Sequence, residues 1–181
     1  MKVINRFPVL ETERLILREI GTNDNEALFD IFSSETIMKY YGMFPYEEMS
    51  QAEQLISNFA KAFDEEKSIR WGIELKGENI LVGTCGFHNW NKKHQRAELG
   101  YELHDNHWKK GYVSEAISEV IKYGFHNLEL NRIEALVYPD NIASHNSLEK
   151  LGFDKEGLLK EYCIFRNIKQ DLIMYSLISN E

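Results

Sequence analysis

The segment RAELGYELHDNHWKKGYVSEAI, residues 96–117, reads as a strand, a loop and the beginning of a helix. Apolar residues alternate with polar residues or glycine from 97 to 103, so the predicted strand presents one set on each face. Gly100 lies in mid-strand, where a glycine indicates a bulge or the close approach of another backbone or a ligand. From Tyr112 to Leu128 apolar residues recur at steps of three and four, which predicts a helix of roughly four turns with one buried stripe.

Gly111 lies directly before this predicted helix. The first N–H groups of a helix have no intrahelical partner and carry the positive end of its dipole, so an anion fits there. A glycine allows a positive φ and removes the Cβ that would hold a ligand away, while Lys109, Lys110 and Ser114 add charge and a hydroxyl. The segment therefore indicates an anion site, although a glycine that merely turns the chain beside solvated lysines explains the same pattern. A dinucleotide fold is disfavoured, because it requires three spaced glycines and repeated strand and helix units.

The rest of the chain predicts a mixed sheet flanked by helices, in one domain spanning residues 1–181. Three consecutive antiparallel strands are separated by the hairpin connectors GEN and NKKH. Strands are expected at 13–20, 70–76, 80–90, 94–104 and 132–138, with two more in 163–178 around a turn at 166–170. Helices are expected at 24–32, 49–66, 112–128 and 142–151, the last ended by Gly152.

Composition narrows the class of protein. The 181 residues are 43% hydrophobic and 28% charged, which indicates an ordinary globular chain rather than a disordered one. A net charge of -8 disfavours direct nucleic-acid binding and suits a basic or amine-bearing partner. No apolar run approaches the ~18 residues that span a bilayer and no signal peptide is recognisable, so a cytoplasmic location away from membranes is expected. Cys85 and Cys163 are too few for a disulfide framework or a cysteine metal site.

Together with RIEALVYPDNIASHNSLEKLGFDKEG, residues 132–157, the opening segment resembles the GNAT acyltransferase superfamily, most closely its branch of ribosomal-protein N-terminal acetyltransferases of the RimJ and RimL type. LETERLILREI near the N-terminus, and KEYCIFRN and DLIMYSLI near the C-terminus, match that branch too, so the resemblance spans about residues 9–178. It implies an α/β GNAT fold, in which a mostly antiparallel central sheet contains a splayed strand pair and is flanked by helices.

The resemblance also implies acetyl-coenzyme A as the acyl donor. Its pyrophosphate is expected at the loop before the 112–128 helix, and its pantetheine arm in a wedge between the strands at 99–103 and 133–138. A bulge near Gly100 would aim an N–H at the thioester carbonyl. Asn141 matches a family asparagine that bonds the pantetheine arm, with a helix cap as the alternative. The expected donor-binding residues are Leu99, Tyr101, Leu103, Lys109, Lys110, Gly111, Tyr112, Val113, Ser114 and Asn141.

The expected catalytic residues also come from the resemblance. Ser144 matches a serine proposed to protonate the departing thiolate, and its alternative role is to bond helix backbone. Glu161 matches a glutamate near the acceptor site, and Glu98 occupies a strand position where other members place an acid; water could equally deprotonate the amine. The chain departs from the wider superfamily at Trp108 and Val113 in the phosphate loop and at Leu148, where a tyrosine often serves as general acid.

These expectations combine into N-acetylation of a primary amine through a ternary complex, for example at the N-terminal α-amino group of a ribosomal protein. The alternatives are an acetyltransferase of a small amine, such as a polyamine or aminoglycoside, and a non-catalytic protein that binds or senses acyl-coenzyme A. No metal is expected, because His104 and His107 lie in a predicted loop rather than on one helix face. The sequence leaves the acceptor undetermined and allows a homodimer.

Overall fold

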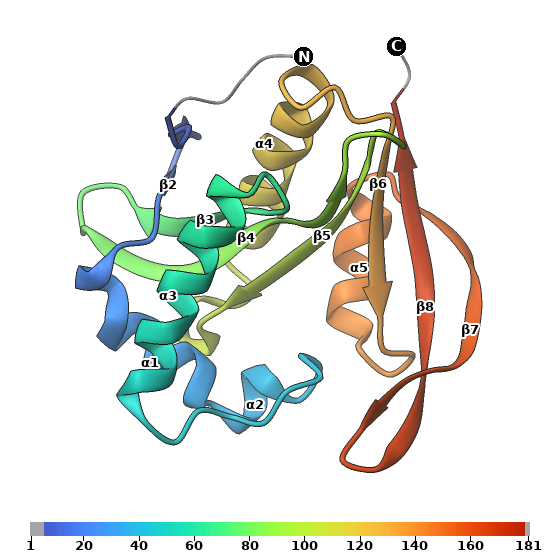
Figure 1. The fold of residues 1–181 in the computed structure, drawn as a ribbon, viewed down its shortest axis with the longest axis horizontal. Coiled ribbons are helices and arrows are strands. Elements are labelled where there is room, and N and C mark those ends of the chain that lie inside the picture. Colours follow the sequence, from blue (N-terminus) through green and yellow to red (C-terminus); the bar gives the residue numbers. More distant parts are fainter. Residues whose placement is uncertain (1–5, 180–181) are drawn as a thin grey trace.

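The computed structural model describes residues 6–179 and has an eight-stranded sheet in the order β1-β2-β3-β4-β5-β6-β8-β7 (Figure 1). The strands are β1 Leu10–Glu11, β2 Leu15–Arg18, β3 Ile69–Leu75, β4 Ile80–Asn91, β5 Arg96–Leu103, β6 Arg132–Val137, β7 Asp154–Phe165 and β8 Ile168–Ile178. The helices are α1 Asn25–Ser33, α2 Glu35–Met38, α3 Met49–Asp64, α4 Tyr112–His126 and α5 Ile142–Lys150, with 3-10 turns at Thr22–Asp24 and Asp105–His107. The fold is the mixed α/β arrangement that the sequence predicted.

The central feature of the sheet is the divergence of β5 from β6. All the other neighbouring strands pair antiparallel, whereas β5 and β6 run parallel. Their pairing covers only Arg96–Glu98 against Arg132–Glu134, although β5 continues to Leu103 and β6 to Val137. Figure 1 shows the two strands separating along their length. The splayed strand pair that the sequence predicted is therefore confirmed.

Helices cover both faces of the sheet and form two hydrophobic clusters. One cluster joins α4 and α5 to residues of β2 through β6 and β8, and it includes Leu17, Ile117 and Leu148. The other joins α1, α2 and α3 to the sheet through Leu81 of β4, and it includes Ile20, which follows β2. Because both faces are covered, every residue of β3 is buried and this strand lacks the alternation of a one-sided strand. No helix in the described part of the chain is long and apolar enough to cross a membrane.

The structure corrects the predicted C-terminal hairpin. Strand β7 begins at Asp154 rather than at 163, and its first residues, DKEG, are mostly exposed, so they carry no hydrophobic pattern. The turn is the pair Arg166 and Asn167 alone, because Phe165 already pairs with Ile168. Both turn residues have positive φ, 53° and 59°, as a two-residue hairpin loop requires. The short elements β1 and α2 were not predicted, because two and four residues are too few to show a period.

The predicted bulge at Gly100 is wrong. Gly100 pairs with Gly86 in continuous register between β4 and β5, and the register shift lies further along, between His88 and Asn91. The close approach that a mid-strand glycine also indicates does occur: a Cβ on Gly100 would lie 2.8 Å from Nη1 of Arg70. Gly100 therefore leaves the space that a buried guanidinium occupies.

Candidate functional site

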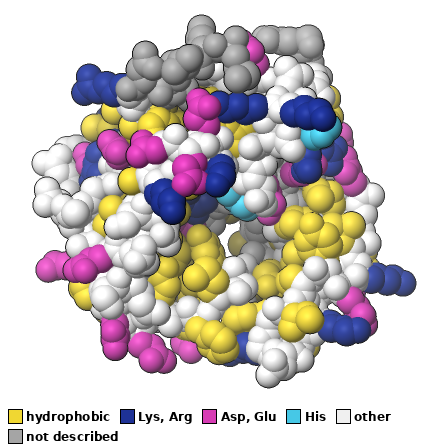
Figure 2. Space-filling view, in the orientation of Figure 1, with side chains coloured by type: hydrophobic (Ala, Val, Ile, Leu, Met, Phe, Trp, Pro, Cys, Tyr) yellow, Lys and Arg dark blue, Asp and Glu magenta, His cyan; other side chains and the backbone are white. Residues whose placement is uncertain are grey.

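A cavity of about 510 Å³ opens where β5 and β6 diverge. Its walls come from residues 36–41 around α2, from the end of β5, from the loop and first turn of α4 and from the first turns of α5. Tyr101 and Glu102 are consecutive on β5, so their side chains leave opposite faces of the strand, and both line the cavity. The cavity therefore reaches both faces of the sheet, and Figure 2 shows a hollow near the centre of the molecule.

The N-terminus of α4 faces this cavity without a cap. Gly111 is the N-cap residue, with φ 83°, and no side chain bonds the end of the helix. The first backbone bond of the helix runs from the N–H of Glu115 to the carbonyl of Gly111, at 3.1 Å. The N–H groups of Tyr112, Val113 and Ser114 precede that bond, and all three residues line the cavity. The predicted anion site thus has the geometry that an α-helix offers to a phosphate.

The loop before α4 is held from both sides. Arg14 forms an ion pair with Glu115 at 2.6 Å, and its Nη1 donates to the carbonyl of Lys110 at 2.9 Å. On the other side, Nε1 of Trp108 donates to the carbonyl of Leu103 at 2.7 Å, which ties the loop to the end of β5. The backbone carbonyl of Lys110 thus helps to fix the loop, and Lys110 does not line the cavity. Leu103, Trp108 and Lys109 do line it.

The N-terminus of α5 forms the wall opposite β5. Oδ1 of Asn141 accepts a bond from the N–H of Ser144 at 3.3 Å, so the helix-cap alternative for Asn141 is confirmed, and the residue also lines the cavity. The hydroxyl of Ser144 lies 2.6 Å from the phenol oxygen of Tyr101, which joins α5 to β5. Burial raises the pKa of Tyr101 to about 12, with the bond to Ser144 opposing that rise. The phenol consequently remains protonated near neutral pH.

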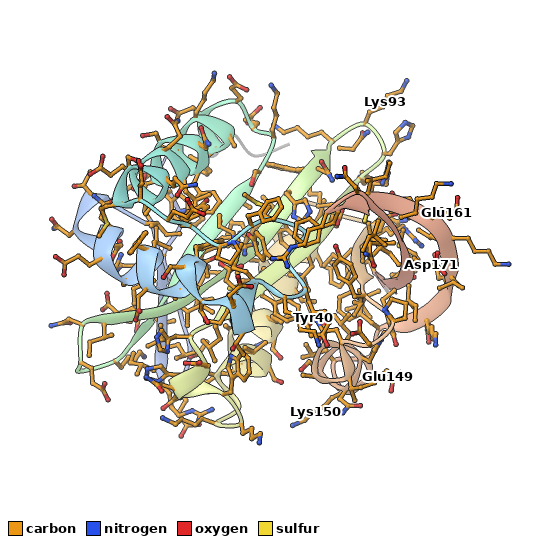
Figure 3. The ribbon with its side chains drawn as sticks, turned by 90° about the horizontal axis from the view of Figure 1, so that it is seen from below. Tyr40, Lys93, Glu149, Lys150, Glu161 and Asp171 are labelled. Atoms are coloured by element: carbon orange, nitrogen blue, oxygen red, sulfur yellow. The ribbon has the colours of Figure 1, made fainter. Side chains whose placement is uncertain are left out.

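Neither predicted glutamate base lines the cavity. Burial opposes ionisation of Glu98, but bonds from His88, at 3.1 Å, and from Asn89, at 3.0 Å, leave its pKa below the ordinary value. Glu161 has a side chain that is 61% exposed and forms an ion pair with Lys169 at 2.5 Å. Figure 3 shows Glu161 at the outer side of the β7–β8 hairpin, away from Tyr40 of the cavity wall. Their catalytic roles stay predictions.

Leu99 and Leu148 both lie in the hydrophobic core. Leu99 belongs to the hydrophobic core and does not line the cavity, so its proposed backbone contact with the donor stays a prediction. Leu148, where the family often has a tyrosine, is fully buried in the same core. The residues that line the cavity include two hydroxyl groups in mutual contact, those of Tyr101 and Ser144.

Glu102 was not singled out from the sequence. Its side chain is only 3% exposed and bonds the guanidinium of Arg70 on β3 and the hydroxyl of Thr84 on β4. Tyr41, which follows α2 and lines the cavity, contacts the same carboxylate. The sequence gives little indication of this role, because Glu102 and Arg70 occupy polar positions of strands that also contain other charged residues.

The mouth of the cavity on the α2 side is aromatic. Tyr40 lines it and donates to the carbonyl of Asp140 at 3.2 Å. The exposed ring of Phe44 packs on Phe165 at the tip of the β7–β8 hairpin, with 5.4 Å between ring centroids, and Arg166 at this tip lies 3.6 Å from Glu35 of α2. The guanidinium of Arg166 lies 5.1 Å from the centroid of each of these two rings. We call the residues Tyr40, Phe44, Phe165 and Arg166 the aromatic rim.

Comparison with known proteins gives consistent results. A family model described as the acetyltransferase (GNAT) domain matches residues 14–154. The chain is 46% identical over 172 residues to the uncharacterized N-acetyltransferase YoaA of Bacillus subtilis, covering 95% of this chain and 97% of that protein. Its structure resembles a GNAT-family acetyltransferase from Bacillus anthracis, with a TM-score of 0.86 and 30% identity over 96% of this chain and all of that one. It also resembles a putative ribosomal-protein-serine acetyltransferase from Vibrio cholerae, with a TM-score of 0.82 and 25% identity over 94% and 97% of the two chains.

Proposed function

The chain belongs to the GNAT acetyltransferase family, and on that premise we propose that it transfers the acetyl group of acetyl-coenzyme A to the primary amine of a polypeptide N-terminus. The observation that carries the proposal is the cavity that reaches both faces of the sheet between β5 and β6. A donor and an acceptor that enter from opposite faces meet in this gap without a covalent enzyme intermediate.

The α4 and α5 face suits the donor. The uncapped N-terminus of α4 accepts the pyrophosphate of coenzyme A through the N–H groups of Tyr112, Val113 and Ser114, and Lys109 adds a positive charge. The unpaired edge of β5 beyond Glu98 leaves backbone groups for the amide groups of the pantetheine arm. The arm then leads into the gap.

The chemistry requires an amine to attack the thioester carbon, the C–S bond to break and the sulfur to gain a proton. Ser144 lines the cavity from the α5 side, which supports it as the donor of that proton. The Tyr101 phenol, 2.6 Å from the serine oxygen, can replace the proton that Ser144 donates. The pair takes the place of the tyrosine that many relatives have where this chain has Leu148.

The α2 face suits an acceptor with a single amine. Glu102 is the one carboxylate among the described residues that line the cavity, whereas a polyamine with several positive charges requires several carboxylates. The aromatic rim offers apolar surface to the first side chains of a peptide. The Vibrio cholerae neighbour named as a putative ribosomal-protein-serine acetyltransferase makes an N-terminal serine the first acceptor to test.

The test is the release of coenzyme A thiol with acetyl-coenzyme A and a panel of amines. Short peptides with a free N-terminal serine or alanine should give turnover, and the same peptides blocked at the N-terminus should give none. Faster turnover with spermidine or an aminoglycoside would overturn the polypeptide acceptor. Tight binding of acetyl-coenzyme A with no turnover across the panel would favour the non-catalytic sensor.

A further inference from the structure

We propose that Glu102 accepts the proton of the acceptor's ammonium group, on the face of the sheet opposite the Tyr101–Ser144 pair. The proposal rests on the acetyl transfer proposed above and assigns the base for it. Glu102 thereby replaces Glu98 and Glu161 in that role, because neither of those side chains lines the cavity.

The pleat of β5 directs the proposed proton donor and the proposed base to opposite faces of the sheet. Tyr101 points to the α4 and α5 face, where it bonds Ser144, and Glu102 points to the face of α1 and α2, where it contacts Tyr41. Both residues lie beyond Glu98, where β5 has separated from β6, so both border the gap. The sulfur of a thioester in the gap would receive its proton from one face, and the attacking amine would lose its proton to the other face.

Glu102 forms a buried ion pair beside the cavity. The pair with Arg70 is buried on both sides, with side chains 7% and 3% exposed, and Nε of Arg70 also donates to the Thr84 hydroxyl at 2.6 Å. Removing two charges from water costs about as much as their attraction returns, so such a pair is a poor source of stability. The guanidinium lies so close to Gly100 that a Cβ there would be 2.8 Å from Nη1 of Arg70. The fold therefore retains a buried carboxylate at the edge of the cavity although its ion pair adds little to stability.

The carboxylate retains capacity for a further donor. Thr84 bonds Oε1 and Arg70 bonds Oε2, whereas the two oxygens of a carboxylate together accept about four hydrogen bonds. Tyr41 supplies one more contact from the cavity side, which leaves a place for an ammonium N–H. An amine held there has a hydrogen-bond acceptor on the side away from the thioester.

Among the charged and titratable groups around it, Glu102 is the carboxylate that its surroundings shift toward the protonated form. Burial raises the pKa of Glu102, and Arg70 opposes that rise. Burial also raises the pKa values of Cys85, to about 12, and of Tyr41 and Tyr46, so all three stay neutral. The pKa of Arg70 is raised by Glu102 despite burial, so the guanidinium stays charged.

The proton balance closes without another reactant. The ammonium loses its first proton to Glu102, and the total charge on Arg70, Glu102 and the amine is unchanged by that transfer. The neutral nitrogen then attacks the thioester carbon, the C–S bond breaks, and the sulfur takes a proton from Ser144. The second proton lost by the nitrogen restores the hydroxyl pair, and Glu102 releases its proton to water after the products leave.

The test compares three variants with acetyl-coenzyme A and an N-terminal serine peptide. Glu102→Gln keeps the size of the side chain and removes its basicity, so we expect kcat/KM to fall about 100-fold. The remaining rate should rise with pH up to the ionisation of the peptide's own α-amine, near 8. Glu102→Gln combined with Arg70→Met removes the unpaired guanidinium and separates folding from chemistry. Glu74→Gln, at a carboxylate buried against Arg18 outside the cavity, is the matched control.

The outcomes are distinct. We expect the double variant to recover the wild-type unfolding midpoint in urea but not the wild-type kcat/KM. We expect Glu74→Gln to keep the wild-type pH profile. Recovery of kcat/KM together with stability, or a wild-type pH profile in Glu102→Gln, would overturn the proposal and leave Glu102 as a structural partner of Arg70. Failure of the wild-type enzyme to acetylate any amine would instead remove the proposed function, and the inference with it.

Discussion

At the scale of single residues, the Tyr101–Ser144 contact links two chain positions that the sequence separates by 43 residues. Ser144 lies on a helix N-terminus fixed by Asn141, and Tyr101 lies on a strand fixed on one side by β4. Each hydroxyl therefore has a rigid support. Removing either one tests the proton path to sulfur separately from donor binding.

Ser144→Ala should lower kcat about 100-fold, because the departing thiolate loses its nearest proton donor. Tyr101→Phe should lower kcat by about fivefold to tenfold, the worth of one hydrogen bond, because Ser144 then lacks its partner. The KM for acetyl-coenzyme A should change little in both variants. Ser57→Ala, which removes an exposed helical hydroxyl bonded to Glu53, serves as the control. A wild-type kcat in Ser144→Ala would mean that Ser144 does not protonate the sulfur.

Gly100→Ala should destabilise the fold by about 1 to 3 kcal/mol, since the added methyl collides with Arg70 in a packed interior. Gly157→Ala on β7 is the matched change, because no atom lies within 4 Å of the Cβ it would add. Urea unfolding of the two variants measures the difference. Equal stabilities would show that the guanidinium moves aside at no cost.

At the scale of elements, helices α4 and α5 both depend on a glycine in the left-handed region. Gly111, with φ 83°, begins α4 at the cavity, and Gly152, with φ 85°, follows α5 away from it. The two positions share a backbone conformation and differ in whether a ligand approaches. They form a natural pair for separating stability from binding.

Gly111→Ala and Gly152→Ala should each cost about 1 to 2 kcal/mol of stability, because an L-residue is strained in this region. Only Gly111→Ala should also weaken coenzyme A binding, since relief of the strained φ at 111 shifts the start of α4, which lines the cavity. Titration calorimetry with coenzyme A compares the two variants. Equal affinities would show that the α4 N-terminus does not hold the ligand.

At the scale of the whole molecule, ion pairs connect parts of the sheet that lie far apart in the sequence. Arg132 at the start of β6 bonds both oxygens of Glu156 on β7, at 2.6 and 2.7 Å. These bonds, with one from Ser176, lower the pKa of Glu156 to about 2 from an ordinary 4.5. Burial alone would raise the pKa of Asp24, but bonds from Arg18 and Gly21 lower it. These paired carboxylates make stability depend on acid pH.

A carboxyl whose folded pKa is depressed stabilises the fold fully above its unfolded pKa, and this contribution is lost as pH falls toward the folded value. Stability should therefore decline between about pH 4.5 and 2, the window set by Glu156. Glu156→Gln should lower stability at pH 7 and reduce its dependence on acid pH. Urea unfolding at pH 7 and pH 3 measures both effects. An unchanged slope would place the acid sensitivity elsewhere, for instance at Asp24.

The sequence by itself determined the elements whose side chains follow a clear period. The α4 helix begins at Tyr112 as predicted, and the antiparallel meander from β3 to β5 follows from alternation and turn residues. The resemblance carried by residues 96–117 and 132–157 predicted the GNAT fold and its splayed strands. The start of β7 was missed, because its exposed, charged residues lack a hydrophobic pattern.

Only the tertiary structure decided which polar groups share the cavity. The Arg70–Glu102 pair spans 32 positions, and nothing in the local pattern of either strand connects them. Gly100, interpreted as a bulge, proved to be the space for that pair, because a glycine has the same appearance in a sequence whichever atoms approach it. Local periodicity records which face of an element is buried, whereas contacts across the sheet depend on register and on the divergence of β5 from β6. For that reason the fold could be predicted from the sequence, whereas Glu102 as the proposed base could not.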